Sequence, residues 1–209
     1  MHNSNTFGRV SILICLLTIS IGTRAQESLY DGCGTTKGCF GTPDSCVESK
    51  SCDIVTTYLY ITDLDAYQFE LYGNVSDPTT NYLAIGLSEN SKMGDDSVVL
   101  CSTLNNEEHV DQYWTRGFPK SAKILDEPSL GILESTVAIT DGAFYCSFVR
   151  EAVTNIPNPY ADETTTFDLK ANLYHLLVAA GPFDENGAAK KHFEKRPSPE
   201  PIDLNEFSD

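Results

Sequence analysis

Short runs of β-branched and aromatic residues recur along this chain at roughly ten-residue intervals, with Gly, Pro, Asn and Asp between them. No window of helical length keeps apolar residues in a sustained helical period. Many short strands separated by turn residues are typical of two packed antiparallel sheets. We therefore expect an all-β protein, an immunoglobulin-type antiparallel β-sandwich of about nine to eleven strands. The runs occupy residues 53–61, 67–71, 82–87, 97–101, 113–114, 123–125, 132–139, 144–149 and 169–180.

Two of these runs predict which side chains face the interior. Successive side chains of a strand point to opposite faces. Phe144, Cys146 and Phe148 should therefore share one face of their strand. Within the run over residues 169–180, His175, Leu177 and Ala179 should share one face of the strand, and Leu176 and Val178 the other. Both faces are mostly apolar, so this strand is expected to be a central one with His175 beside apolar neighbours.

The first 25 residues have the pattern of a secretory signal peptide. Arg9 precedes a nearly continuous apolar run over residues 10–21, and the small residues Thr23 and Ala25 suit signal-peptidase cleavage after Ala25. The run is shorter than the roughly 20 apolar residues that a membrane span needs. We expect a secreted, extracellular protein without a membrane span.

Six cysteines follow the predicted leader, and an even number in a secreted chain indicates disulfides. The first four are separated by five, six and five residues. Structural zinc sites usually contain a closer pair, so metal is the poorer interpretation. Fifteen pairings are possible, and we expect the N-terminal segment to be bridged both to itself and to the sandwich. The six are Cys33, Cys39, Cys46, Cys52, Cys101 and Cys146.

Changes in composition divide the rest of the chain. Residues 26–51 are rich in Gly, Ser, Thr and Cys and are expected to form a Cys-rich segment packed on the domain. Residues 52–182 carry the strand runs. Residues 183–209 contain few apolar residues, several prolines and the charged residues around His192, a composition that predicts a disordered tail.

The charge of the chain limits its partners. The formal net charge is −16 at pH 7, which disfavours nucleic acids and anionic membranes because both are negative. Asn74-Val75-Ser76 is an acceptor sequence for N-glycosylation. It lies between a strand run and Asp77-Pro78, so we expect Asn74 to be exposed and glycosylated in a secreted chain.

Two residues stand out as metal ligands. Met93, the only methionine after the leader, lies in the loop that follows Gly86-Leu87-Ser88, and His175 lies inside the strand-like run Tyr-His-Leu-Leu-Val-Ala-Ala-Gly-Pro. A thioether and an imidazole form one of the axial pairs that hold haem iron for electron transfer. The many carboxylates read as solvated turns, although Asp95 and Asp96 could instead orient the Met93 loop by accepting backbone N–H bonds.

These two segments resemble the DOMON domain, in its cytochrome and ferric-chelate-reductase branch, over residues 52–182. The resemblance implies a DOMON-like sandwich in which Met93 and His175 bind the iron of one b-type haem. Such a six-coordinate iron has no open position, so the implied role is single-electron transfer with a partner in trans rather than an enzyme on its own. The alternative is a haem-free extracellular module that recognises carbohydrate or protein.

Other chemistries find no support in the sequence. The chain has no Gly-x-Ser-x-Gly nucleophile elbow and no His-x-His pair. We therefore expect neither a serine hydrolase nor a copper monooxygenase.

Overall fold

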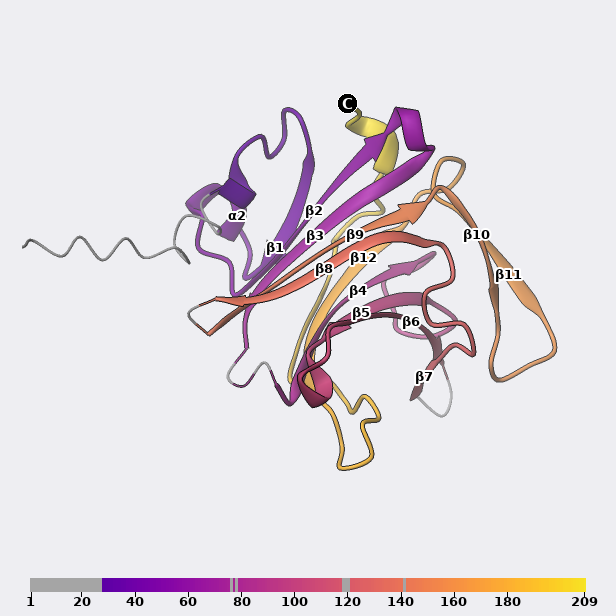
Figure 1. Ribbon diagram of the computed structural model, residues 1–209. Helices are drawn as coiled ribbons and strands as arrows, with labels where there is room; N and C mark the ends of the chain where they lie inside the picture. The colour runs from indigo at the N-terminus through magenta and orange to yellow at the C-terminus, as the bar shows by residue number, and fades with distance from the viewer. Residues whose placement is uncertain (1–27, 76, 78, 118–120, 141) are drawn as a thin grey trace, which may run out of the picture.

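A computed structural model of the chain describes residues 28–209 except 76, 78, 118–120 and 141 (Figure 1). The predicted signal peptide, residues 1–25, lies outside the described residues. The chain forms two antiparallel sheets that face each other, which confirms the expected all-β sandwich. The five-stranded sheet has the order β1 (Gly38–Thr42), β2 (Ile54–Ile61), β3 (Ala66–Asn74), β9 (Ala143–Glu151) and β8 (Ile132–Thr140).

The second sheet has six strands, so the two sheets together reach the upper end of the expected strand number. A separate hairpin of β10 (Val153–Pro157) and β11 (Thr164–Asp168) adds buried side chains to the same core. The short helices are α2 (Cys46–Ser49), η1 (Thr62–Leu64), η2 (Leu104–Asn106) and η3 (Leu204–Glu206). The order of the second sheet is β13 (Glu194–Pro197), β12 (His175–Pro182), β4 (Asn81–Ser88), β5 (Ser97–Ser102), β6 (His109–Arg116) and β7 (Ser121–Ile124).

The core lies between the inner faces of the two sheets. Phe144, Cys146 and Phe148 of β9 are all buried, which confirms the predicted shared face. β12 is flanked by β13 and β4, as expected for an inner strand. Its residues Leu176 and Val178 face the core, whereas the alternate set, which begins at His175, faces the outer side of the sheet.

All six predicted disulfide cysteines are paired. Cys101 of β5 and Cys146 of β9 join the two sheets through the core, and both are fully buried. The other bridges are Cys33–Cys39 and Cys46–Cys52. As expected, the N-terminal segment, residues 26–51, is bridged to itself by Cys33–Cys39 and to Cys52, the first residue of the predicted sandwich domain, by Cys46–Cys52. β1 also pairs with β2, and this backbone pairing attaches the segment to the sheet.

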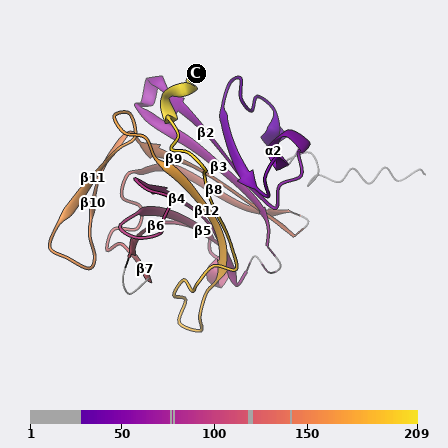
Figure 2. The same cartoon turned by 180° about the vertical axis from the view of Figure 1, so that it is seen from behind.

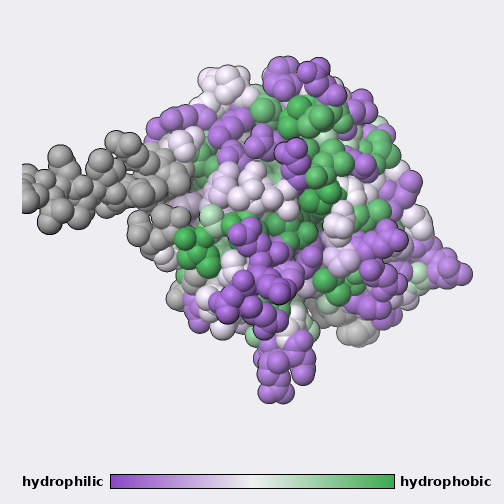
Figure 3. Space-filling view, viewed as in Figure 1, coloured by the Kyte–Doolittle hydropathy of each residue, from purple (hydrophilic) through white to green (hydrophobic). Residues whose placement is uncertain are grey.

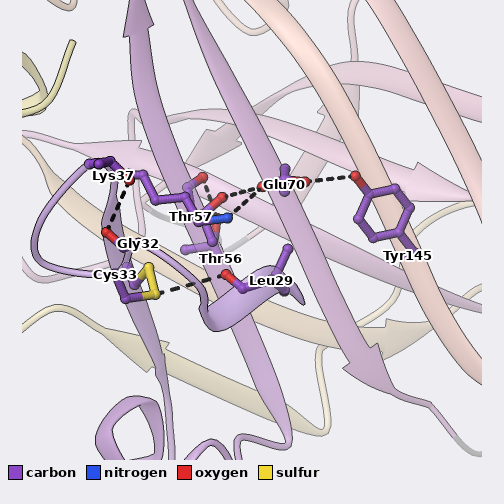
Figure 4. A network of polar contacts seen from close by, with 10 residues as sticks. Leu29, Gly32, Cys33, Lys37, Thr56, Thr57, Glu70 and Tyr145 are labelled. Carbon is purple, nitrogen blue, oxygen red and sulfur yellow. Dashed lines mark hydrogen bonds and ion pairs between the residues drawn. A yellow bond between two sulfur atoms is a disulfide. The ribbon is translucent and has the colours of Figure 1, made fainter. Parts of the chain in front are cut away.

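A carboxylate in the middle of the five-stranded sheet also holds the N-terminal segment (Figure 4). Glu70 of β3 accepts hydrogen bonds from Lys37 Nζ at 3.2 Å, Thr57 Oγ1 at 2.9 Å and Tyr145 OH at 2.8 Å. Burial, and then the Glu70 charge, raise the pKa of Tyr145 to about 12. The tyrosine therefore stays protonated and remains a donor to Glu70 at neutral pH.

The prediction of a disordered tail over residues 183–209 is wrong. β13 forms the edge of the six-stranded sheet through backbone pairing with β12, which needs no apolar side chains. Further on, Leu204 is fully buried in the core. Ser208 pairs with Tyr60, so the C-terminus lies beside β2, where the yellow segment is visible in Figures 1 and 2.

The outer surface carries apolar side chains only in small groups on the face seen in Figure 3, between hydrophilic residues. Among the described residues, no helix is long and apolar enough to span a membrane. Asn74 is exposed at the end of β3, so its side chain is accessible as expected. Its glycosylation remains a prediction.

Candidate functional site

The Met93 loop connects β4 to β5 and is fastened to β6. Asp95 donates its backbone N–H to the Thr115 carbonyl at 2.9 Å. Gly94 has a φ of +142°, and a Cβ at this position would lie 2.5 Å from Gly117 Cα. Only glycine fits such a backbone conformation and such a close approach. Gly94, the residue after Met93, is therefore fixed in place by its close packing against Gly117.

Asp96 orients the same loop. Its Oδ2 accepts the Gly94 backbone N–H at 2.7 Å and the Thr115 hydroxyl at 3.0 Å. The residue is only 1% exposed, and burial raises the pKa of its carboxyl. This confirms that Asp96 orients the Met93 loop through a backbone N–H, whereas Asp95 is exposed.

Replacing Asp96 with alanine should therefore loosen the Met93 loop. The Gly94 N–H and the Thr115 hydroxyl would lose their acceptor, and each unsatisfied buried donor costs about 1–3 kcal/mol. Asp96→Asn keeps one acceptor oxygen and removes a buried charge, so its effect should be smaller. Urea denaturation of both variants and of Asp95→Asn, the exposed neighbour, measures the difference. Equal stability of Asp96→Ala and Asp95→Asn would contradict this assignment.

A cavity of about 820 Å³ opens on the outer face of the six-stranded sheet. Its floor consists of small and apolar side chains that alternate with the inward-facing core residues of the same strands. A floor of this kind presents few polar groups to a bound molecule. The floor residues are Ala84, Gly86, Val98, Leu100, Leu177 and Ala179.

Met93 and His192 both line this cavity. Met93 comes from the loop that follows Ser88, the last residue of β4. His192 lies near the first residues of β4, because its Cα is 2.7 Å from the position of a Cβ on Gly181, which pairs with Tyr82. From Tyr82 to Ser88 a strand rises by roughly 20 Å. The thioether and the imidazole thus enter from opposite ends of the cavity floor.

His175, the predicted partner of Met93, does not line the cavity. It pairs with Ser88, so it lies at the same end of β4 as the Met93 loop. Its Nδ1 is 2.9 Å from the Ser198 carbonyl oxygen, and the Ser198 hydroxyl accepts the Leu176 N–H at 3.1 Å. In this arrangement His175 fastens the chain after β13 to β12.

His192 was missed because the composition of its surroundings predicted disorder. Nothing in the charged residues around it marks His192 as a ligand. Its partly buried position lowers the pKa of its imidazole, and the nearby Lys195 charge lowers it further. The neutral imidazole is the form that can bind a metal, so His192 is available as a ligand at neutral pH.

The cavity gathers positive charge on an acidic protein. Asp96 is the one acidic residue in its lining, and its hydrogen bonds point into the loop. Arg196 is paired with Asp44 outside the cavity. The cavity lining also contains four lysines, and none of them forms an ion pair within the described part of the chain. The cationic lining residues are Lys92, Lys190, Lys191, Lys195 and Arg196.

In the part of the chain that the structure describes, side chains alone do not form a metal site. Groups of three or more His, Cys, Asp or Glu residues that could hold an ion are absent there. A metal bound in the cavity would therefore need further ligands from a cofactor.

Comparison with known proteins identifies the family. Residues 50–181 match the DOMON domain model. A Drosophila melanogaster homolog of ferric-chelate reductase 1 is 37% identical over 190 residues, which are 88% of this chain and 27% of that protein. Human ferric-chelate reductase 1 is 29% identical over 78% of this chain and 25% of its own length. The chain thus spans about a quarter of these relatives.

Two further comparisons involve another human protein and a solved structure. The human DOMON domain-containing protein FRRS1L is 29% identical over 82% of this chain and 53% of its own length. Among solved structures, the cytochrome domain of Myriococcum thermophilum cellobiose dehydrogenase aligns with a TM-score of 0.47 and 8% identity, over 78% of this chain and 77% of that domain.

Proposed function

Since the chain belongs to the DOMON family, we propose that the cavity on its outer face binds one b-type haem for single-electron transfer, with Met93 and His192 as axial ligands. One observation carries the proposal. A thioether and an imidazole line the same cavity and reach it from opposite ends of an apolar floor. Met93 and His192 would hold the haem iron, one from each end of this floor.

The cavity fits such a group in size and in chemistry. Its volume of about 820 Å³ lies within the range of small-molecule and cofactor sites. Met93 supplies a soft sulfur, and His192 supplies an imidazole that its surroundings keep neutral. When bound, the haem would supply an iron that alternates between two oxidation states. The apolar floor would exclude water from it.

The basic residues suit the rest of the cofactor. A b-type haem carries carboxylates on one edge of an otherwise apolar ring. Lys190, Lys191 and Lys195 line the cavity, and none of them forms an ion pair among the described residues. Exposed ion pairs contribute only about 0–1 kcal/mol each. We therefore propose that the lysines orient the ring by its carboxylate edge, while the floor and the two ligands supply most of the affinity.

The pair predicted from the sequence, Met93 with His175, is the second arrangement to test. The Ser198 carbonyl engages His175 Nδ1 and leaves Nε2 free to bind iron, the usual state of a metal-binding histidine. His175 would, however, have to reach the cavity from the end that Met93 already occupies. The geometry favours His192. Secretion and a redox partner in trans remain parts of the proposal. An activity like that of the much longer ferric-chelate reductases is also only proposed for this chain.

Haem titration of the purified chain tests the proposal. We expect one equivalent to give sharp low-spin bands on reduction. Ala179 faces the cavity, so Ala179→Phe should fill the floor and weaken haem binding at least about tenfold, the result of about 1.4 kcal/mol. Ala138→Phe on the outer face of β8 is the matched control. A chain that stays colourless would favour the haem-free recognition module, and equal haem binding by both variants would contradict binding in this cavity.

A further inference from the structure

Four buried side-chain atoms lack a hydrogen-bond partner among the described residues. They are Trp114 Nε1, Arg150 Nε and Nη2, and Thr154 Oγ1. The nitrogens can only donate, and the hydroxyl can also donate. Buried polar groups are nearly always paired, so three unpaired residues in one core need a common explanation.

All three residues surround the ring of Phe167. The Arg150 guanidinium carbon lies 5.7 Å from the ring centroid, and the Trp114 ring lies edge-on at 5.9 Å. Thr154 pairs with Phe167 across the β10–β11 hairpin. The β10–β11 hairpin therefore covers the side of the core where Trp114 of β6, Arg150 of β9 and Thr154 of β10 each lie next to Phe167.

Arg150 adds an uncompensated charge to this region. It is 1% exposed and forms no ion pair within the described part of the chain. Burial lowers the pKa of its guanidinium to about 10, so it still carries its charge at neutral pH. The Phe167 ring offsets part of the desolvation of a cation. A buried charge without a counter-charge is otherwise strongly destabilising.

We infer that the core beside Phe167 binds a small monovalent anion, of the size of a halide, through Arg150, Trp114 and Thr154. An anion accepts every one of the unpaired donors and neutralises the guanidinium. A water molecule could accept hydrogen bonds but would leave the charge in place. The Thr154 hydroxyl lies close to the Gly131 backbone, because a Cβ on Gly131 would lie 2.8 Å from Thr154 Oγ1, so the proposed ligand is a single-atom anion rather than a phosphate or a carboxylate.

Thermal unfolding at constant ionic strength tests the site without haem. Sodium chloride replaces sodium gluconate stepwise, since gluconate is too large for the region. A specific anion raises Tm in proportion to the logarithm of its concentration above Kd, by about 5 °C at 100-fold Kd. Thr154→Val keeps the shape of the side chain and should weaken this chloride dependence at least about tenfold in apparent Kd. Arg150→Met should abolish it.

Arg116→Met is the matched control, because Arg116 also lies over an aromatic ring, that of Tyr160, but near the surface. It should keep the full chloride dependence. Identical Tm values of the parent in chloride and gluconate would overturn the inference, and so would a dependence that persists unchanged in Thr154→Val and Arg150→Met. Neither result bears on haem binding, which the visible spectrum reports separately.

Discussion

Replacing His192 with alanine is expected to abolish six-coordinate low-spin haem, whereas His175→Ala should leave the spectrum unchanged. His192 lines the cavity opposite Met93, and His175 is bonded to Ser198 outside it. Loss of the imidazole removes the stronger of the two axial ligands. Met93→Leu should keep the haem but open one coordination position, because leucine fills the space of the thioether without binding iron.

His109→Ala provides the control for general effects of removing a histidine, since His109 lies near Glu107 and Asp111, away from the cavity lining. Visible spectra of the reduced variants, recorded at matched haem occupancy, give the result. If His175→Ala loses the low-spin bands and His192→Ala keeps them, the pair expected from the sequence is correct and the assignment of His192 is wrong.

Removing the Cys101–Cys146 disulfide should have the largest effect on stability. The bridge closes a loop of 45 residues, and the loss of its constraint on the unfolded chain corresponds to about 4 kcal/mol. Both cysteines are fully buried, so the double alanine variant also leaves a cavity between the sheets. Guanidinium denaturation of Cys101→Ala/Cys146→Ala against the parent measures the change in unfolding free energy.

The matched control is Cys33→Ala/Cys39→Ala. This bridge has a sequence separation of 6, so its chain-entropy contribution is about 2 kcal/mol. It also lies outside the space between the two sheets. If both double variants lose the same free energy of unfolding, the core bridge does not have the role in joining the sheets that its position indicates.

Alternation of side chains explains why the sandwich could be predicted from the sequence. Phe144, Cys146 and Phe148 alternate with polar residues, and a period of two leaves only one way to bury them. The same reasoning placed His175 on the face of β12 opposite Leu176. It did not say that this face is the outer one, because both faces of the strand are apolar.

The C-terminal part could not be predicted in this way. β13 is held by backbone hydrogen bonds to β12, which leave no mark on the composition of the strand. The buried Leu204, with the partly buried Ile202 and Phe207, then anchors the segment that follows to the core. Since His192 lies just before β13, the failure to predict this strand also hid the cavity wall. The pairing of Cys101 with Cys146 could not be predicted for a similar reason, because it depends on which strands face each other.

The proposed coordination is tested most directly by iron-edge X-ray absorption of the haem-loaded His175→Ala variant. This variant keeps Met93 and His192 as the available axial ligands in the cavity. We predict an iron surrounded by five nitrogens and one sulfur. A spectrum without sulfur, or one with only the four porphyrin nitrogens, would contradict the proposed coordination by Met93 and His192.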